Sequence, residues 1–561
     1  MPANQGQLPY FFHDVSCIAV LTTLSDTEQE QRLKCVFYKK VNDVKFEDAM
    51  DIAGYGKFSM YIIFLSGLSI ATSLLGSVDI SFLLPAAECD LQLTSEDKGL
   101  IGSAYFIGTI ASAHLSGFLA DTMGRRYVIL WSLALNVPTY VFGSLAPEFW
   151  TFFILKLISG ILSSPTLIAS IPFVGEFVPM KQRTQAILIS SSLSAFSLVY
   201  SASVGWATLQ AEWSLDLWLL KFTPWRLFYL LCGLPSLMGA VLFWITPESP
   251  KFLLSRGKKG DTLKVMQSVH SINSGANPQT YPVHSICMDA GEDMPTSPAR
   301  RKGVTGVVKH VCDQTLPLLK PPYLTIMTVS VLSTSVTFLC INTVLLWLPE
   351  VTNRIAYFKQ EHEGDFYMCE MMSYNSSVIL DIHPSECHST INTAVFLPNL
   401  VIALLRPLAM VFASIVLSFI DRKLFLMLCF IIGGMSTILI VWIPDATIIV
   451  ILFGSLPLFT GICYNIIASF MVEFFPTYIR AMAVSLCLIC GRLGSILGSQ
   501  LFSHLIDSHC LLLFYLIAGM FLCCAPLSFC FNFNSKPVQN SNNQDLDQGK
   551  IAVPERKLEI G

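Results

Sequence analysis

A short charged segment at the junction of two apolar runs has the residue types of an ion-pair network. The segment 117–126 reads GFLADTMGRR, between the apolar runs 98–119 and 127–146. Its residues of interest are Gly117, Asp121, Gly124, Arg125 and Arg126. A carboxylate can accept hydrogen bonds from arginine or cap a neighbouring helix, and arginines can bridge to acids or to helix C-termini.

Such contacts, made in one conformation and broken in another, would form a conformational latch. We expect Asp121 to accept from an arginine or to cap the next helix. We expect Arg125 and Arg126 to bridge to Glu176 or to helix C-termini. The alternative is that these charges only anchor the loop at the membrane surface.

A second motif occurs twice and divides the chain into two related parts. Glu-Phe-x-Pro-x-x-x-Arg spans 176–183 and 473–480, with the end residues Glu176, Arg183, Glu473 and Arg480. The two glutamates are 297 positions apart, and the loop acids Asp121 and Asp421 are 300 apart. The similar offsets predict two related halves, as in transporters that rock around a central site. Because no Gly-Arg follows Asp421, we expect a weaker latch in the second half.

Four charged residues well inside apolar runs form a candidate cavity set, because a charge there is costly and suggests function. They are Asp79, Lys156, Arg406 and Arg492. Pro407 follows Arg406 and predicts a kink there. The set is net positive, which hints at an anionic or zwitterionic solute in a central cavity.

The elements that must position these residues are membrane helices. The chain has 561 residues, of which 53% are hydrophobic and 13% charged, against about 25% charged in soluble domains. Twelve apolar runs approach or exceed the length of about 20 residues that a span requires. They lie near 58–84, 98–119, 127–146, 150–172, 185–210, 225–246, 323–348, 394–420, 424–443, 446–471, 480–504 and 510–532.

The predicted fold is an all-α integral membrane protein with twelve transmembrane helices in two pseudo-symmetric six-helix bundles. The expected parts are a cytoplasmic N-terminal segment (1–57), the first bundle (58–246), a central cytoplasmic loop (247–322), the second bundle (323–532) and a disordered cytoplasmic tail (533–561). Residues 44–57 fit either a short interfacial helix, with Phe46, Met50 and Ile52 on its apolar face, or a plain linker.

The basic residues predict the orientation. They gather in the loops on one side, which the positive-inside rule assigns to the cytoplasm together with both termini. The loop 349–393 is then luminal or extracellular. It holds a glycosylation sequon at Asn375, and Cys369 and Cys387 could form a disulfide there.

Several motifs resemble known families. The segment 117–126 resembles the signature loop between helices 2 and 3 of the major facilitator superfamily. The block 247–257, PESPKFLLSRG, resembles a block of organic-ion and synaptic vesicle transporters. The segments 54–58 and 84–91, with 225–226 and 235–236, are similar to the synaptic vesicle glycoprotein 2 family, and within it to insect-type paralogues. The likeness covers roughly 44–530, mostly in the first half.

The resemblance implies the major facilitator fold and a glycosylated loop between helices 7 and 8. It also implies a ligand pocket with a tryptophan in helix 5, matched by Trp206, and an aromatic–asparagine pair in helix 10, matched by Tyr464 and Asn465. Aromatic side chains there could hold an organic ligand by stacking or cation–π contact.

The resemblance also bears on coupling. The family's acidic residues in the first helix are absent from 73–76, and Asp79, three residues later, is the candidate substitute. The Arg-x-x-x-Gly pattern that the superfamily shows in helix 4 appears here as Lys156-x-x-x-Gly160, which keeps the charge and loses the bidentate guanidinium.

The expected function is secondary transport of a small organic solute by alternating access, with or without a coupling ion. The alternative is a transport-inactive vesicle or membrane protein that acts as a trafficking or binding partner. Without a phosphate-binding loop or a cluster of catalytic side chains, we expect no enzyme activity, cofactor or metal. We expect a monomer in a plasma or vesicle membrane, with no nucleic-acid partner.

Overall fold

The computed structural model describes residues 44–210, 213–217, 220–287, 315–321, 323–373, 391–475 and 477–531, all within one compact unit. Among them, 11 helices are long and apolar enough to cross a membrane. The twelfth span of the fold is α3 (Ser95–Met123), which lies between α5 and α19. Its first turns hold Glu96, Asp97 and Lys98, which lower its mean hydropathy. Asn375, Cys387 and the tail 533–561 lie outside the described residues.

The first bundle contains six spans, two of them broken. Beside α3 its helices are α2 (Lys57–Leu91), α4 (Arg125–Ser144), α5 (Phe149–Gly175), α6 (Met180–Leu193), α7 (Phe196–Thr208), α8 (Pro224–Cys232) and α9 (Leu234–Ile245). α6 and α7 form the fifth span, and α8 and α9 the sixth. The sixth breaks at Gly233, beside Pro235, because proline has no N–H to continue the hydrogen-bond ladder. In the connection between the fifth and sixth spans, β2 (Leu215–Leu217) pairs antiparallel with β3 (Leu220–Phe222).

The second bundle repeats this plan. Its spans are α13 (Tyr323–Glu361), α16 (Phe396–Val416), α17 (Arg422–Trp442), α18 (Ala446–Phe474), α19 (Thr477–Leu505) and α20 (Cys510–Leu527). Short elements flank them: η3 (Leu316–Leu319), α14 (Met368–Ser373), η4 (Thr393–Val395) and η5 (Ser528–Phe531). α13 runs well beyond residue 348, where the apolar run ends, because its last turns hold buried ion pairs.

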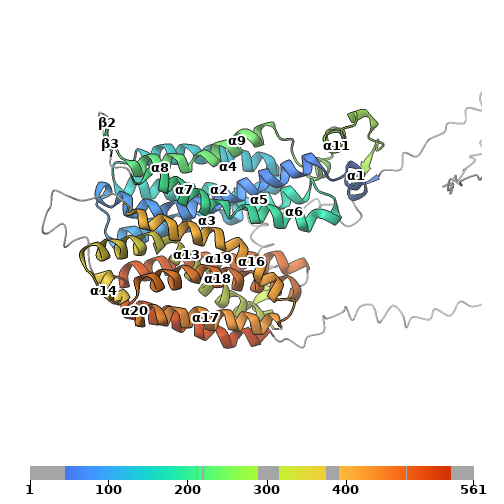
Figure 1. Ribbon diagram of the computed structural model, residues 1–561. Helices are drawn as coiled ribbons and strands as arrows, with labels where there is room; N and C mark the ends of the chain where they lie inside the picture. Colours follow the sequence, from blue (N-terminus) through green and yellow to red (C-terminus); the bar gives the residue numbers. More distant parts are fainter. Residues whose placement is uncertain are drawn as a thin grey trace, which may run out of the picture. The chain divides into compact units, whose positions relative to one another are not determined.

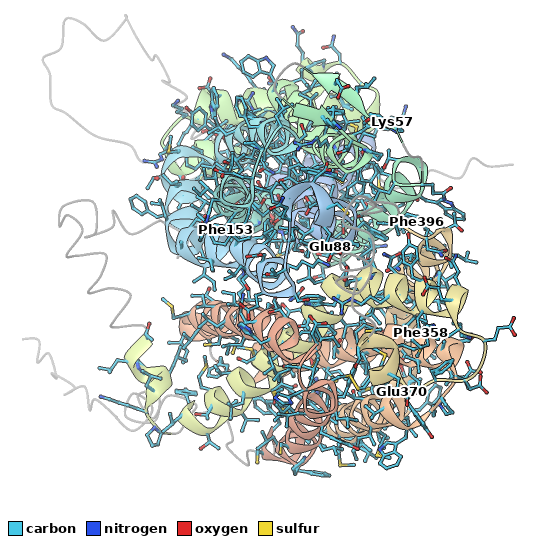
Figure 2. The ribbon with its side chains drawn as sticks, turned by 90° about the vertical axis from the view of Figure 1, so that its left-hand side faces the viewer. Lys57, Glu88, Phe153, Phe358, Glu370 and Phe396 are labelled. Atoms are coloured by element: carbon cyan, nitrogen blue, oxygen red, sulfur yellow. A yellow bond between two sulfur atoms is a disulfide. The ribbon has the colours of Figure 1, made fainter. Side chains whose placement is uncertain are left out.

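The bundles pack mainly through three pairs of helices: α2 against α13, α3 against α19, and α7 against α16. Figure 1 shows the first bundle in blue to green beside the second in yellow to red. We call the end with α1 and α11 cytoplasmic and the end with α14 luminal, by the orientation that the basic residues predict. Figure 2 looks onto the luminal end, where Glu88 and Phe396 lie close to the junction of the bundles.

A small cytoplasmic layer covers the first bundle. It contains α1 (Phe46–Ala53), α10 (Pro250–Ser255), α11 (Lys259–Ser274), η1 (Pro278–Thr280) and the parallel strands β1 (Val44–Lys45) and β4 (Ile286–Cys287). α1 buries Phe46 and Met50 in a core shared with α11 and leaves Ile52 exposed. The predicted short helix is therefore present, with Phe46 and Met50 but not Ile52 on its buried face, and the plain-linker alternative is wrong. Its location at the membrane interface stays a prediction.

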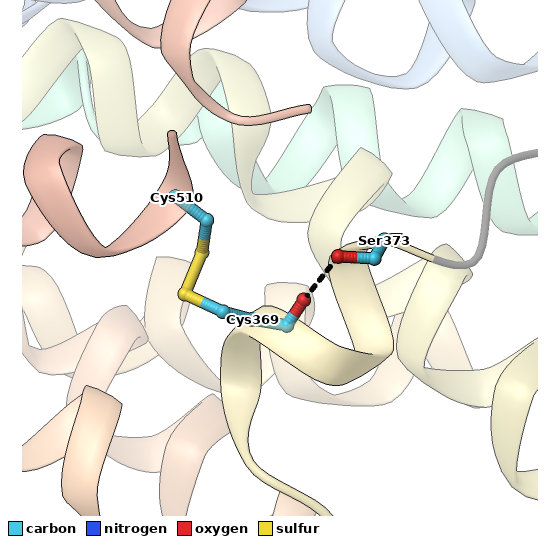
Figure 3. The surroundings of a disulfide bond; sticks show 3 residues. All are labelled: Cys369, Ser373 and Cys510. Carbon is cyan, nitrogen blue, oxygen red and sulfur yellow. Dashed lines mark hydrogen bonds between the residues drawn. A yellow bond between two sulfur atoms is a disulfide. The ribbon is translucent and has the colours of Figure 1, made fainter. Parts of the chain in front are cut away.

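The predicted disulfide between Cys369 and Cys387 is wrong. Cys369 in α14 is bonded to Cys510 at the start of α20, with Cα atoms 5.6 Å apart (Figure 3). The hydroxyl of Ser373 donates a hydrogen bond of 2.8 Å to the carbonyl of Cys369. Sequence proximity misled the prediction because α14 folds back onto α17 and α20. Cys89 is also disulfide-bonded.

Candidate functional site

The cytoplasmic end of the first bundle is organised around the pair of Arg125 and Glu176. Arg125 lies at the first position of α4, and its Nη1 is 3.0 Å from Oε1 of Glu176, directly after α5. The hydroxyl of Ser249 donates to the other oxygen of Glu176. Asp121 is 3.6 Å from Nη2 of Arg125 and largely exposed. We call Asp121, Arg125 and Glu176 the cytoplasmic latch.

Glu248, and not Asp121, caps the N-terminus of α4. Its carboxylate accepts from the backbone N–H groups of Arg126, at 3.0 Å, and Tyr127, at 3.2 Å. A helix N-terminus favours such an acid because its N–H groups are unpaired. Gly124 has φ +108°, and a Cβ there would lie 2.5 Å from the Glu248 carboxylate, so the cap explains this glycine. Of the two roles expected for Asp121, the structure shows the ion pair with Arg125 and not the helix cap.

Other cations bind the ends of neighbouring helices. The guanidinium of Arg126 donates to the carbonyls of Phe243 (3.0 Å) and Trp244 (2.6 Å) at the end of α9. Arg256 donates to the carbonyls of Thr122 and Asp121 at the end of α3. These contacts join the loop between α3 and α4 to the segment after α9.

Arg183 connects α6 to the cytoplasmic layer. Its Nη2 is 2.7 and 3.0 Å from the two oxygens of Glu47 in α1. Lys251 lies 3.8 Å from the same carboxylate. Among the described residues, Arg183 is thus paired with Glu47, whereas Glu176, its counterpart in the repeated motif, is bound by Arg125 and Ser249.

The second half has a simpler arrangement. Asp421 caps α17 by accepting from the N–H of Lys423 at 2.9 Å. Glu473 is 3.0 Å from Arg422, and both side chains are about half exposed. Arg480 donates to the carbonyl of Phe475 at 3.1 Å. Exposed pairs are worth little because water screens them, in line with the weaker second latch expected from sequence.

The protonation of Glu176 gives a prediction about pH. Burial raises the pKa of the Glu176 carboxyl from 4.5 to about 6, although Arg125 and Ser249 act in the opposite direction. The folded protein therefore binds a proton more tightly than the unfolded chain. This group's contribution to stability is present below pH 4.5 and is lost as the pH rises through 6.

We expect the unfolding free energy of the parent protein, relative to Glu176→Gln, to rise by about 2 kcal/mol between pH 7 and pH 4.5. Unfolding in mixed micelles over this pH range measures the difference. A difference that stays constant with pH would contradict the assignment.

Asp79 and Lys156 form a sealed ion pair inside the first bundle. Nζ of Lys156 is 2.6 Å from Oδ1 of Asp79, and both side chains are fully buried. The rings of Tyr105, Tyr140 and Tyr229 surround the ammonium, with centroids 5.3 to 5.9 Å away. Oδ2 of Asp79 and the hydroxyls of Tyr140 and Tyr229 have no hydrogen-bond partner. Lys156 is thus neutralised locally, which removes it from the positive set predicted for the cavity.

Arg492 lies where the two bundles meet. Its Nη1 donates to the carbonyl of Thr109 in α3 at 3.2 Å, and its charge acts on the hydroxyls of Tyr105 and Tyr464. The ring of Tyr464 packs edge-on against Phe338 at 5.1 Å. No carboxylate among the described residues pairs with this arginine.

Arg406 in α16 lies beside α18, at the turn that contains Gly461. A Cβ at Gly461 would lie 3.9 Å from its Nε, and Asn465, one turn further along α18, donates to the carbonyl of Gly461 at 3.0 Å. The amide of Asn465 also contacts the sulfur of Met410 at 3.2 Å. Within the described part of the chain, Arg406 likewise has no carboxylate partner.

Trp206 belongs to a separate aromatic group nearer the luminal end. Its ring lies parallel to that of Phe396 at 6.4 Å, and Phe396 stacks on Phe82 at 5.8 Å. This group joins α7 and α2 of the first bundle to α16 of the second. No described contact connects Trp206 with Tyr464 or Asn465.

The two bundles are closed together at the luminal end. Ser499 donates to the carbonyl of Gly99 at 3.0 Å, and Gln500 donates to the hydroxyl of Ser103 at 3.0 Å. A Cβ at Gly99 would lie 2.3 Å from the Ser503 hydroxyl, and one at Gly102 would lie 2.4 Å from a methyl group of Leu346. Glycine therefore permits α3 to approach α19 and α13 this closely.

The same face of α3 is open at the cytoplasmic end. Gly117 follows Gly99 by 18 residues, which is five full helical turns, so both point the same way. Among the described residues, a Cβ at Gly117 would meet no atom within 4 Å. Among the described residues, every hydrogen bond between the bundles lies at or on the luminal side of the contact between Arg492 and Thr109.

The fold and its internal charges define a multi-pass membrane protein built from two related bundles. The chain belongs to the major facilitator superfamily, whose sequence profile matches residues 60–379. It is similar to human synaptic vesicle glycoprotein 2B, with 31% identity over 237 residues, or 41% of this chain and 34% of that protein. Rat synaptic vesicle glycoprotein 2A is 29% identical over 244 residues, 43% and 33% of the two chains. The match spans about a third of the length of these relatives.

Solved structures share the fold. The inward open conformation of the xylose transporter XylE from E. coli superposes with a TM-score of 0.59 and 16% identity, covering 86% of this chain and 97% of that one. A bacterial homologue of the human lysosomal transporter Spinster gives a TM-score of 0.58 at 12% identity, covering 85% and 98%.

Sequence reasoning missed several of the residues that complete these sites. Glu248 and Ser249 belong to the block 247–257 that resembles known transporters, but this resemblance does not indicate what either side chain contacts. Glu350 and Arg354 lie in α13 but fall in the part of the sequence assigned to the luminal loop. The spacing Glu350-x-x-x-Arg354 is an i, i+4 pair and could have indicated that the helix continues.

Proposed function

We propose that the chain is a secondary transporter that moves a small organic anion by alternating access. The observation that carries the proposal is the asymmetry along α3. Gly99 is packed against the second bundle, whereas Gly117, on the same face, has open space. A helix with matching glycines at both ends can be approached alternately at either end as the bundles rock.

The cytoplasmic latch supports this proposal. Its residues Arg125 and Glu176, and Ser249, which binds Glu176, all belong to the first bundle and its loops. The described contacts therefore tie α4 to α5 and leave the second bundle unattached at the cytoplasmic end. This is the arrangement expected of a protein open toward the cytoplasm.

The anionic character of the solute rests on Arg406 and Arg492. A cation inside a membrane protein requires an acid, a carbonyl or a ligand as partner. Arg492 has one carbonyl and Arg406 has no described polar partner, while Lys156 is already paired with Asp79. Tyr464 lies near Arg492, and Asn465 donates to the carbonyl of Gly461 beside Arg406, so both could contact an organic group.

Uptake into proteoliposomes tests the proposal. The panel contains organic anions, organic cations, amines and sugars, each with and without an inward proton gradient. We expect saturable uptake of an anion. An increase with the gradient would assign coupling, with the pair of Asp79 and Lys156 as the proposed carrier. Folded protein that takes up no member of the panel would favour the transport-inactive binding partner.

A further inference from the structure

A network of ion pairs crosses between the bundles at the luminal end. Lys98 in α3 is fully buried, and its Nζ lies 2.9 Å from Oε2 of Glu88 in α2. The same nitrogen lies 2.9 Å from Oε1 of Glu350 in α13. One ammonium is thus shared between an acid of its own bundle and an acid of the other.

The network continues inside the second bundle. Nε of Arg354 is 2.9 Å from the same oxygen of Glu350, and its Nη1 is 2.6 Å from Asp507. Asp507 accepts a second hydrogen bond from the hydroxyl of Ser95 in α3. We call Glu88, Lys98, Glu350, Arg354 and Asp507 the luminal ion-pair network.

Each charge in this network has a partner within its own bundle. If the bundles separate, Lys98 keeps Glu88, and Glu350 keeps Arg354, which also keeps Asp507. A buried charge that loses its only partner is strongly destabilising. Within the network, separation breaks Lys98–Glu350 and the contacts of Ser95 with Asp507 and Arg354, so none of its charges is left alone.

We propose that Lys98 is the switch of a luminal gate, whose opening transfers the ammonium from two acids to Glu88 alone. This inference rests on the proposed alternating access and adds the residues that set its luminal equilibrium. Glu350 favours the closed gate because it attracts Lys98 across the interface. Glu88 favours the open gate because it holds Lys98 there and because, when the gate is closed, it repels Glu350 across the interface more strongly than it attracts Arg354.

The two acids therefore give opposite predictions for the same chemical change. Glu350→Gln removes the attraction across the interface and should open the gate. Glu88→Gln removes both the partner of the open state and the repulsion in the closed state, and should hold the gate shut. A role in stability alone would give both variants the same sign.

Cysteine labelling measures the gate without any solute. Ser103, almost completely buried in the seam between α3 and α19, is replaced by cysteine, and a water-soluble thiol reagent is applied to protein in lipid nanodiscs. The labelling rate of the parent protein, which contains only the native cysteines, is subtracted from that of each variant. We expect Glu350→Gln to raise the rate about tenfold, as is typical of coupling between sites, and Glu88→Gln to lower it several-fold.

Glu148→Gln is the matched control, because among the described residues the carboxylate of this luminal acid is bonded only by Thr151 in the first turn of α5. Its rate should equal that of the parent. Adding Lys98→Gln to Glu350→Gln should give no further increase, since the shared contact is already lost. Equal rates in all variants, or changes of one sign for both acids, would overturn the proposal. A gate that responds as expected in a protein without uptake would instead overturn the proposed transport.

Discussion

Replacement of Lys156 by methionine is expected to lower the unfolding free energy by about 3–5 kcal/mol, the range found when one partner of a buried ion pair is removed. The change leaves the carboxylate of Asp79 buried without a cation. It also removes the ammonium from its contacts with three tyrosine rings. Chemical unfolding in mixed micelles measures the effect.

The double variant Asp79→Asn, Lys156→Met separates stability from function. Two neutral side chains at this site leave no unpaired charge, and such replacements are often neutral or stabilising. We expect the double variant to regain most of the lost stability and to lose any dependence of uptake on a proton gradient. A double variant as unstable as Lys156→Met would show that the ion pair is not the cause.

Arg492→Ala is expected to reduce anion uptake by about 100-fold or more, because a charge-assisted hydrogen bond in a dry site contributes up to about 3 kcal/mol. Arg492→Lys keeps the charge and loses the planar guanidinium, so we expect an intermediate loss. Proteoliposome uptake at several solute concentrations distinguishes weaker binding from slower transport.

Lys264→Ala is the control for this experiment. It removes a cation that is 81% exposed on α11. Because α11 belongs to the cytoplasmic layer and not to a membrane span, the change should leave uptake unchanged. Full uptake by Arg492→Ala, in protein with normal folding, would remove this arginine from the proposed site. Arg406→Ala would then test the second cation of the pair.

The fold could be predicted from the sequence because each membrane helix corresponds to a long apolar run. The charges of the cytoplasmic latch were also visible, since Asp121, Arg125 and Glu176 lie in short loops with repeated motifs. Their partners were harder to predict. Glu248 and Glu47 come from segments distant in sequence, and only the packing of the cytoplasmic layer brings them to α4 and α6.

The interior sites show a different limit. Asp79 and Lys156 are 77 positions apart, and no local pattern indicates that they neutralise each other. The luminal ion-pair network was missed because Lys98 and Glu350 lie at the ends of apolar runs, where charges usually contact water. Cys369 was paired with Cys387 by proximity along the chain, whereas the folding of α14 brings it to Cys510.

The glycine at position 99 offers a way to hold the protein in its other shape. Its missing side chain is what lets Ser503 approach, so a leucine in its place would act as a wedge between α3 and α19. The wedge has no room when the luminal end is closed, but it would fit once the second bundle has moved away. A single substitution could therefore trap the opposite conformation and make it available for structure determination.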